Sequence, residues 1–496
     1  MRVVVIGAGF GGLSAAAHCH ADGHEVTVVE RSHRPGGRAG AVAEGGFSLD
    51  IGPTVFTMPE LLDAAFGAVD ASMADHITIE PVDPIYRAVH HDGSVLRVRS
   101  GRAAMTQEIR EFAGAREAGV FNEFCDWVTE LYELQMPNFI DTNYDSIAGS
   151  VRSWRAAIDL VRTGGFRRLD RKVASFFDDE RLRRVFSFQS MYAGVAPHRA
   201  LALYSVITYM DTVAGVYSVR GGLHEAARAL AREITRAGVH VKYDAPVARV
   251  LRDGTGVTTG VELASGERMP ADAVVCNADL PVAYRTLLGG VEAPRVARRG
   301  RYSPSCVLWS AGVGAPMPSD VAHHNVHFGT AWDDAFDDIT QHGRIMRDPS
   351  MLVSVPSLDD PSRAPDGCST IFALEPVPNL DGKVDWVRRS DEVVDRLRRR
   401  VADAGYPVGD VRVEQVVEPL AWERSGLERG TPFSLAHTWR QTGPLRPHNH
   451  DERVPGLFFT GSSTLPGVGV PMVLLSGKLA AERVRQYERE TSTVRW

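Results

Sequence analysis

The first thirty residues, MRVVVIGAGFGGLSAAAHCHADGHEVTVVE (1–30), carry the most informative pattern in the chain. The spacing of apolar residues predicts a strand over 2–6, then a glycine turn, then a helix over 13–22. A second strand over 25–29 ends at Glu30. A G-x-G-x-x-G motif between a strand and a helix, with an acidic residue about 20 positions later, is typical of a dinucleotide-binding βαβ unit. A glycine turn without a ligand is the weaker alternative.

Each part of this motif has its own physical reason. Gly7 permits the tight turn, Gly9 lets the backbone approach a pyrophosphate, and Gly12 lets the helix pack on the strand. The helix N-terminus offers unpaired N–H groups and a positive dipole end to the phosphates. The carboxylate of Glu30 can accept hydrogen bonds from both hydroxyls of a ribose. The motif therefore predicts a bound dinucleotide.

Length and composition set the limits for the rest of the chain. At roughly 100 to 200 residues per domain, 496 residues allow two to four domains or one discontinuous pair. Hydrophobic residues make up 44% and charged residues 24%, which excludes disordered, collagen-like and coiled-coil classes. The net charge of −7 argues against a nucleic-acid partner, although local basic patches are compatible with it.

The sequence pattern predicts a cytoplasmic chain without a spanning segment. The five cysteines form no C-x-x-C pair, which favours a reducing cytoplasm. The N-terminal apolar stretch runs into glycines without a cleavage site, so we expect no signal peptide. No segment reaches the roughly 18 apolar residues that span a bilayer. The least polar segment, ALALYSVITYMDTVAGVY (200–217), predicts a core segment or a lipid-facing surface.

The dinucleotide-binding fold is expected to be assembled from separate stretches of the chain. A turn, a helix and several strands follow Gly221, and a strand, a glycine loop and a helix follow again over 454–486. We therefore predict an α/β protein with a Rossmann-like domain in three pieces, an inserted mixed substrate domain and a helical region that faces a membrane. The predicted ranges are 1–100, 220–290 and 445–496 for the discontinuous domain, 101–219 for the mainly helical insertion and 291–444 for the substrate-binding domain.

Several segments resemble one family. They include RPGGRAG, FSLDIGPT, VVCNAD and AHHNVHFG, and two longer segments within 188–222 and 437–477. Together they resemble the bacterial phytoene desaturases, which are FAD-dependent carotenoid desaturases, and the resemblance runs from residue 1 to about 487. The N-terminal pieces are shared by many flavin oxidases, whereas the two longer segments are more specific. The resemblance implies an FAD enzyme that introduces carbon–carbon double bonds into a long polyprenyl hydrocarbon, with phytoene converted toward neurosporene or lycopene.

The resemblance also implies which residues hold the cofactor. The ADP half is expected to lie against Gly7, Gly9, Gly11, Gly12, Glu30 and Arg31. The pyrophosphate and flavin are expected along Gly37, Arg38, Gly52, Pro53 and Thr54, with the adenine facing the backbone of Val247. The ribityl chain and flavin ring are expected against Gly461, Val468, Gly469, Val470, Pro471 and Met472. The sequence departs from many flavin oxidases in one place, because Ser462 stands where they carry an acidic residue.

The reaction chemistry is suggested partly by what the sequence does not contain. It has no second G-x-G-x-x-G unit for a nicotinamide and no redox cysteine pair, so the flavin is expected to take its electrons from the substrate. The proton that leaves the neighbouring carbon needs an acceptor. His437 and Asp211 are the candidates, and the alternative for each is a structural polar group.

Two other groups of side chains are open to more than one interpretation. His323, His324 and His327 have a spacing compatible with a metal site if the segment is helical, but no carboxylate or cysteine completes the set, so we predict no metal. Aromatic and methionine side chains over 186–217 are expected in the core or in the wall of an apolar tunnel.

The implied substrate points to a membrane surface. At about 0.8 kcal/mol per buried CH₂, a forty-carbon hydrocarbon favours a lipid phase over water by on the order of 30 kcal/mol. We therefore predict a cytoplasmic protein attached peripherally to the inner face of the cell membrane. The basic clusters at 167–172 and 181–184 and the apolar 200–217 segment suggest that the helical insertion makes this contact, although a solvated helix face also explains the clusters.

Other functions on the same fold stay open from the sequence. A flavin-dependent isomerase or saturase of polyenes needs the same cofactor site. A non-catalytic prenyl-lipid binding protein would keep the fold without the flavin, which the complete glycine and arginine set argues against. An amine oxidase fits less well, because amine oxidases do not share the 188–222 segment. The oligomeric state and the terminal electron acceptor cannot be derived from the sequence.

Overall fold

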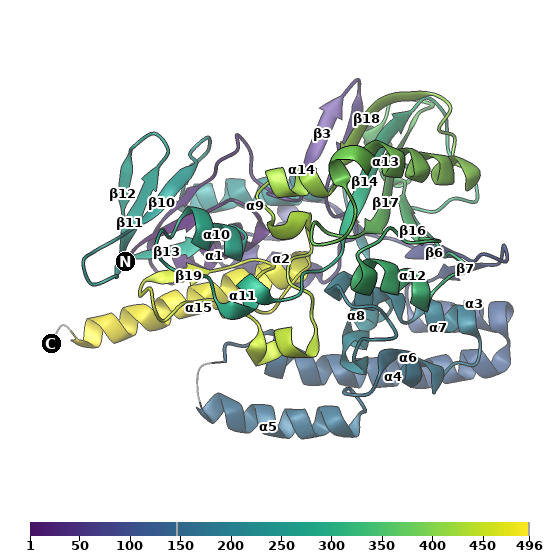
Figure 1. Cartoon of the computed structure of the whole chain (residues 1–496), viewed down its shortest axis with the longest axis horizontal. Coiled ribbons are helices and arrows are strands. Elements are labelled where there is room, and N and C mark those ends of the chain that lie inside the picture. The colour runs from purple at the N-terminus through teal and green to yellow at the C-terminus, as the bar shows by residue number, and fades with distance from the viewer. Residues whose placement is uncertain (145–146, 495–496) are drawn as a thin grey trace.

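The computed structural model describes residues 1–144 and 147–494 of the chain. Its centre is a five-stranded parallel sheet in the order β19-β13-β1-β2-β9, seen at the left of Figure 1. The first two predicted strands are confirmed at their predicted bounds, and the predicted helix begins three residues earlier than expected. The strands of this sheet are β1 (Arg2–Ile6), β2 (Glu25–Val29), β9 (His240–Lys242), β13 (Ala273–Cys276) and β19 (Leu457–Phe459).

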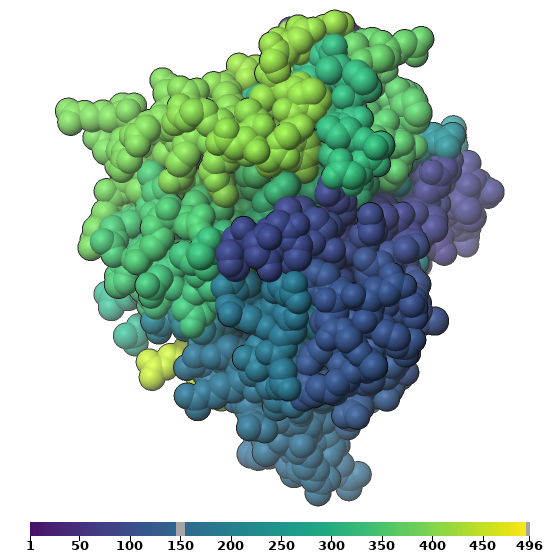
Figure 2. Space-filling model, turned by 90° about the vertical axis from the view of Figure 1, so that its right-hand side faces the viewer, coloured from purple at the N-terminus to yellow at the C-terminus, as the bar shows by residue number. Residues whose placement is uncertain are grey.

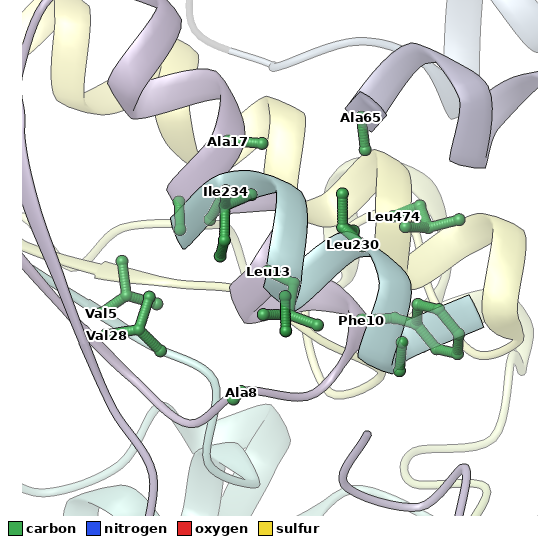
Figure 3. Packing of buried hydrophobic residues seen from close by; sticks show 14 of the residues in the cluster. Val5, Ala8, Phe10, Leu13, Ala17, Val28, Ala65, Leu230, Ile234 and Leu474 are labelled. Atoms are coloured by element: carbon green, nitrogen blue, oxygen red, sulfur yellow. The ribbon is translucent and has the colours of Figure 1, made fainter. Parts of the chain in front are cut away.

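The alternating side chains of the central strands are buried on both faces of this sheet, as expected for parallel strands. Val3 and Val5 pack under the helices α1, α9 and α15, a layer that Figure 3 shows closely, while Val4 and Ile6 face a second layer of strands and the helix α10. The bounds are α1 (Phe10–Ala21), α9 (Leu223–Ala237) and α15 (Val470–Val494) on one side, and β10 (Val247–Arg252), β11 (Thr258–Leu263), β12 (Arg268–Pro270) and α10 (Leu280–Thr286) on the other.

A second, seven-stranded sheet has the order β18-β14-β17-β16-β15-β6-β7, and α13 covers one of its faces. Two of its strands, β6 and β7, come from the first hundred residues. They join this sheet because β6 pairs in parallel with β15 and β7 pairs with β6. The predicted boundary at residue 100 therefore does not follow the sheets. The elements are β6 (Tyr86–Val89), β7 (Val95–Val98), β14 (Ser305–Val313), β15 (His324–His327), β16 (Met351–Ser354), β17 (Ser369–Val377), β18 (Val411–Val417) and α13 (Trp386–Asp403).

The predicted helical insertion lies below this sheet in Figure 1, around a core rich in phenylalanine that includes Phe121, Phe124 and Phe186. The apolar 200–217 segment belongs to this interior, because Ala202, Tyr204 and many of its neighbours are buried. The helices are α3 (Arg102–Ala113), α4 (Ala115–Gln135), η2 (Met136–Ile140), α5 (Ile147–Arg162), α6 (Leu169–Ala174), α7 (Glu180–Val185), η3 (Phe188–Ala193), η4 (Ala202–Ser205), α8 (Val206–Thr208) and η5 (Tyr209–Val213).

The remaining short elements connect these bodies. The strands are β3 (Ala41–Glu44), β4 (Phe47–Asp50), β5 (Ile79–Pro81) and β8 (Tyr217–Val219). The helices are α2 (Pro59–Gly67), η1 (Met73–Asp75), α11 (Arg295–Arg299), α12 (Asp333–Asp337), η6 (Asp338–His342), η7 (Pro356–Leu358), η8 (Pro361–Arg363), α14 (Pro419–Arg424), η9 (Glu428–Gly430), η10 (Trp439–Gln441) and η11 (Gly443–Leu445). Within the described ranges, no helix is long and apolar enough to cross a membrane.

Candidate functional site

The glycine turn after β1 forms the base of the candidate site. A Cβ on Gly12 would stand 1.9 Å from the carbonyl oxygen of Gly7, so only glycine allows the helix to approach the strand here. Helix α1 begins after Gly9, and no side chain caps its N-terminus. Its first N–H groups and the positive end of its dipole are therefore left for an anionic ligand.

Two further loops lie directly over this turn. Gly9 and Gly36 form a bridge between backbones, and a Cβ on Gly37 would lie 3.3 Å from the Cα of Gly9. A Cβ on Gly52 would stand 1.8 Å from the carbonyl oxygen of Arg38, so the loop that carries Gly52 sits against the one that carries Arg38. Three predicted cofactor segments thus meet at the carboxyl end of the parallel sheet, where such sheets bind ligands.

Glu30 closes the other end of the turn. Its buried carboxylate accepts hydrogen bonds from the backbone N–H of Ala8 at 2.6 Å and of Ser32 at 2.9 Å. Each oxygen keeps a lone pair for a ribose hydroxyl. The backbone N–H of Ala245 donates to the Glu30 carbonyl oxygen at 2.8 Å. Val247, at the start of β10, follows two residues after Ala245 and so begins its strand near Glu30.

Arg31 points away from this group toward the chain beyond α14. Its Nη2 donates to the carbonyl oxygen of Ser425 at 2.6 Å, and its side chain lies beside Gly426. The structure therefore gives Arg31 a second role, in holding the segment after α14 against the dinucleotide unit. Its predicted contact with the ADP half stays a prediction.

Two side chains that were not predicted from the sequence lie against the glycine turn. The Asn277 amide, at the end of β13, would contact a Cβ on Gly9 at 3.0 Å and one on Gly11 at 2.9 Å. The Thr460 hydroxyl is buried and has no hydrogen-bond partner in the part of the chain that the structure describes; it would lie 2.9 Å from a Cβ on Gly11. Both residues directly follow buried strands of the parallel sheet. Ligands bind at this end of parallel strands, so their place after a predicted strand is the sequence signal that indicates them.

The departure at Ser462 has a structural explanation. Arg38 Nη2 donates to the Ser462 hydroxyl at 2.6 Å, and Arg38 also donates to the carbonyl oxygen of Pro432. Burial lowers the pKa of the Arg38 guanidinium, and the carboxylate of Asp279 opposes that effect. A short hydroxyl accepts from Arg38 here in place of the acidic residue that many flavin oxidases carry.

The predicted flavin loop is held from behind by one buried arginine and one buried asparagine. Arg446 donates to the carbonyl oxygens of Ser462 at 2.5 Å and Thr464 at 3.0 Å. The Asn449 amide donates to Phe459 and Leu465 carbonyl oxygens at 3.0 and 3.3 Å. These two residues were also missed from the sequence. They fix the backbone from Phe459 to Leu465. The stabilisation of negative charge by N–H groups near Gly469 stays a prediction.

The far end of this loop reaches the helical insertion. Met472 packs against a small apolar cluster that contains Met58, Val206 and Met210. Met472 and Val470 belong to the first turn of α15, which the sequence predicted two residues later. Met472 therefore contacts the insertion. The predicted flavin contacts of Gly461, Val468, Gly469, Val470, Pro471 and Met472 stay predictions.

His437, one of the two candidate proton acceptors, lies against the same loop. A Cβ on Gly467 would stand 2.3 Å from the Cε1 atom of His437. Its backbone is fixed by Ala193 and by the Tyr204 hydroxyl, which donates to its carbonyl oxygen at 2.6 Å. Burial, and then the nearby charge of Arg446, lower the pKa of His437 well below its usual value, and its Nε2 has no partner over residues 1–144 and 147–494. The ring is therefore neutral, and its part in proton transfer stays a prediction.

Asp211, the other candidate, lies in a buried π-helical turn of the insertion beside Met210. The Thr212 hydroxyl donates to its Oδ1 at 2.8 Å. Burial raises the pKa of Asp211 to about 7, and hydrogen bonds from Thr212 and Gln189 limit the rise. The Tyr86 hydroxyl, whose pKa is raised by burial and by this carboxyl, is buried without a partner. The carboxyl can exchange a proton near neutral pH, and its catalytic role stays a prediction.

The three histidines considered for a metal do not lie on a helix. His324 and His327 belong to β15, where residues three apart point to opposite faces of the sheet. The condition for a shared metal site is therefore not met. Over residues 1–144 and 147–494, no group of three or more histidine, cysteine or acidic residues is placed to hold a metal ion.

The geometry fits a dinucleotide. An uncapped helix N-terminus, a carboxylate at the ribose position, an unpartnered Thr460 hydroxyl and glycines that leave room for a pyrophosphate meet in one place. The other predicted residues of this set, Pro53 and Thr54, follow Gly52 in the same loop. The assignment of individual cofactor contacts stays a prediction, but the residues present can hold the group.

Comparisons with known proteins agree with this geometry. A family described as flavin containing amine oxidoreductase matches residues 10–485. A phytoene dehydrogenase of Streptomyces griseus is 47% identical over 491 residues, covering 97% of this chain and 95% of the relative. A zeta-carotene-forming phytoene desaturase of Myxococcus xanthus is 37% identical over 492 residues, covering 97% and 93%. A solved oxidoreductase from Methanosarcina mazei has a TM-score of 0.61 at 18% identity, covers 98% of this chain and 100% of its own, and so shares the fold.

The expected fold class, with its Rossmann-like domain in separate pieces, is confirmed. The flavin of the matched family and the dinucleotide cradle of this chain together identify the cofactor as FAD. The chain belongs to the flavin-containing amine oxidoreductases and, within them, to the bacterial phytoene desaturase family.

Proposed function

We propose that the protein is an FAD-dependent desaturase that introduces carbon–carbon double bonds into a linear carotenoid precursor, with phytoene as its substrate. The observation that carries this proposal is the whole-chain similarity to a phytoene dehydrogenase, at 47% identity. The apolar interior of the helical insertion, which contacts the end of the flavin loop at Met472, supports it, because a hydrocarbon needs such a lining.

The chain's own residues have three tasks in this reaction. When bound, FAD supplies the hydride acceptor. The glycine turn and Glu30 hold the cofactor, and Arg446 and Asn449 fix the loop that borders it. Apolar side chains such as Met58 and Met210 exclude water. The second hydrogen leaves as a proton, for which His437 and Asp211 remain the proposed acceptors.

A phytoene incubation tests the proposed function. The purified protein with FAD and phytoene-loaded liposomes, supplied with oxygen or a quinone, is expected to yield products that lose two hydrogens for each new double bond and absorb at longer wavelength. Mass spectrometry separates the alternatives. An isomerase would leave the mass unchanged, a saturase would raise it, and a binding protein would leave both mass and absorption unchanged.

We propose further that the protein collects its substrate as a peripheral membrane protein through helix α5. Trp154, Ile158 and Val161, spaced to share one face of α5, are 70%, 48% and 65% exposed. In Figure 1 α5 lies along the lower edge of the molecule, and the steel-blue atoms at the lower tip of Figure 2 belong to this part of the chain. The buried 200–217 segment does not support the proposal, because it lies inside the insertion.

Other exposed groups flank this face. Phe166, just beyond α5, packs edge-on against Trp439, which is itself 58% exposed. The side chains of Arg155 and Arg162 on α5, and of Arg167 just beyond it, are exposed and can contact anionic headgroups. An amphipathic helix with exposed aromatic and aliphatic side chains beside arginines is typical of a helix that lies in a membrane interface.

Replacing Trp154, Ile158 and Val161 with serine is expected to weaken binding to anionic liposomes about 100-fold. Each side chain is partly exposed and contributes about 1 kcal/mol or more when it enters lipid, so the three together contribute ~3 kcal/mol. Flotation with liposomes measures this loss, and a matched control replaces Val387, which is 83% exposed on α13, with serine. Equal flotation of the triple variant and the control would contradict the α5 proposal.

A further inference from the structure

A line of polar side chains crosses the second sheet from the cofactor loops to the surface. The Thr54 and Ser354 hydroxyl oxygens are 3.4 Å apart, and Ser354 Oγ lies 2.8 Å from His324 Nδ1. The rings of His324 and His323 meet edge to face with centroids 4.3 Å apart. His323 Nδ1 lies 2.6 Å from Asp359 Oδ2. We call these five residues the relay.

The middle of the relay is fully enclosed. Ser354 has no exposed surface and His324 is 2% exposed, and they face each other across β15 and β16. Among the described residues, Nε2 of His324 has no hydrogen-bond partner, which is costly for a buried ring nitrogen. Burial and the neighbouring His323 lower the pKa of His324 well below its usual value, so its ring is neutral and has one N–H donor and one acceptor.

His327, on the same strand, is only half-buried and has a different arrangement. Its Nε2 lies 3.0 Å from the Tyr406 hydroxyl, on the other face of the sheet, and it takes no part in the line of polar groups. His324 is therefore the histidine of this strand that lies beside a second histidine and the Ser354 hydroxyl, and His327 does not share these neighbours.

Both ends of the relay are placed for proton movement. At the inner end, Thr54 follows Gly52, whose backbone lies against Arg38 in the candidate FAD site. At the outer end, His323 and Asp359 line a surface cleft of about 310 Å³. The charged groups that face this end are Asp83, Arg87, Arg97 and Asp320 in the wall of the cleft, where Arg87 pairs with Asp320 at 2.8 Å. The side chain of Asp359 is 38% exposed, so water reaches it.

We propose that Thr54, Ser354, His324, His323 and Asp359 carry the proton released by each desaturation from the cofactor site to the surface cleft. This inference rests on the proposed desaturase function. Each new double bond breaks two C–H bonds: one hydrogen leaves as hydride, with its electron pair, to the flavin, and the other leaves as a proton while its electron pair forms the double bond. In this path Thr54, rather than His437 or Asp211, is the first acceptor: the proton joins the Thr54 oxygen as the Thr54 proton moves on, and the last proton leaves Asp359 to water.

The hydrogen bonds of the relay can all point outward at once. Thr54 donates to Ser354, and Ser354 donates to Nδ1 of His324, which leaves the ring proton of His324 on Nε2. No hydrogen bond joins His324 to His323 within the described ranges; their rings meet edge to face, so the proton passes between them only when one ring shifts. The Nδ1–H of His323 then donates to Asp359. Because loss of hydride makes the neighbouring C–H bond strongly acidic, a hydroxyl is a sufficient first acceptor. His324, His323 and Asp359 act through Thr54 and are positioning residues.

Kinetics on the FAD-loaded enzyme test this path. His324→Ala and Asp359→Asn are expected to slow flavin reduction by bound phytoene about 100-fold, the low end of what proton-transfer groups contribute. Added imidazole is expected to restore much of the His324→Ala rate, and His327→Gln is the matched control that keeps the wild-type rate. If both relay variants match wild type, or if imidazole leaves His324→Ala unchanged, the relay is overturned.

A measurement without substrate gives an independent result. In protein labelled with ¹⁵N-histidine, the His324 signals are those that disappear in His324→Ala. They are expected to show a neutral ring with its proton on Nε2 between about pH 6 and about pH 8, and Ser354→Ala is expected to weaken this tautomer. A proton on Nδ1 would reverse the hydrogen-bond order and overturn the relay. If the wild-type protein does not reduce flavin with phytoene, the desaturase proposal fails. The position of the His324 ring proton still tests the hydrogen-bond order of the relay in that case.

Discussion

FAD binding is expected to weaken about 1,000-fold or more when Gly9 is replaced by valine. The backbone of Gly9 has φ −75°, which any residue adopts, so the substitution does not strain the turn itself. Its Cβ would stand 3.0 Å from the Asn277 amide and 4.0 Å from the Cα of Gly37. The branched carbons of valine would then fill the space through which the pyrophosphate reaches the helix N-terminus. Losing two charge-assisted hydrogen bonds at about 2 kcal/mol each gives ~4 kcal/mol, which is a factor of ~1,000.

The flavin absorbance of the purified protein and calorimetric titration of the apoprotein with FAD measure this effect. Gly119→Val is the matched control, because Gly119 is exposed on α4 and a Cβ there meets nothing within 4 Å. Circular dichroism of both variants shows whether the fold is kept. A Gly9→Val protein that is purified yellow and binds FAD as tightly as wild type would contradict the site as we describe it.

The local parts of the fold were predictable because they depend on neighbouring residues. The βαβ unit is one continuous stretch, in which the glycines and Glu30 each meet a requirement that the stretch itself defines. Other parts depend on a distant partner, which neighbouring residues do not reveal. Strand β6, within the first hundred residues, pairs with β15, more than 230 positions later, and so joins the other sheet.

Some site residues could not be predicted for the same reason. Ser462 was noted only as a departure, and its hydrogen bond comes from Arg38, far away in the sequence. His323 and His324 were read as a motif that would need a helix, whereas pairing with β16 makes their segment a strand and brings Ser354 beside His324. The apolar 200–217 segment is another example, because composition does not distinguish a lipid-facing surface from the interior that encloses it.

Asp211→Asn is expected to raise the free energy of unfolding at pH 8. The carboxyl is 5% exposed, and burial raises its pKa from 3.8 to about 7. Because the folded-state pKa is raised, the protonated form contributes stability that is complete below about pH 4 and is lost as the pH rises through about 7. At about 1.4 kcal/mol per pKa unit, the wild-type protein loses on the order of 4 kcal/mol over this window, and a neutral asparagine removes this loss.

The shape and hydrogen bonding of the site allow the replacement. Asparagine keeps the oxygen that accepts from the Thr212 hydroxyl, and its new N–H groups have acceptors near them, because the Gln189 Oε1 and the Tyr86 hydroxyl are buried without partners. Urea unfolding of both proteins at pH 5 and pH 8 measures the effect. The advantage of the variant is expected to be about 3 kcal/mol larger at pH 8 than at pH 5, and Asp366→Asn, at an exposed aspartate, should show no such difference. An advantage independent of pH would mean that the wild-type carboxyl titrates at its ordinary value, and then neither its burial nor its candidacy as a proton acceptor near neutral pH could be maintained.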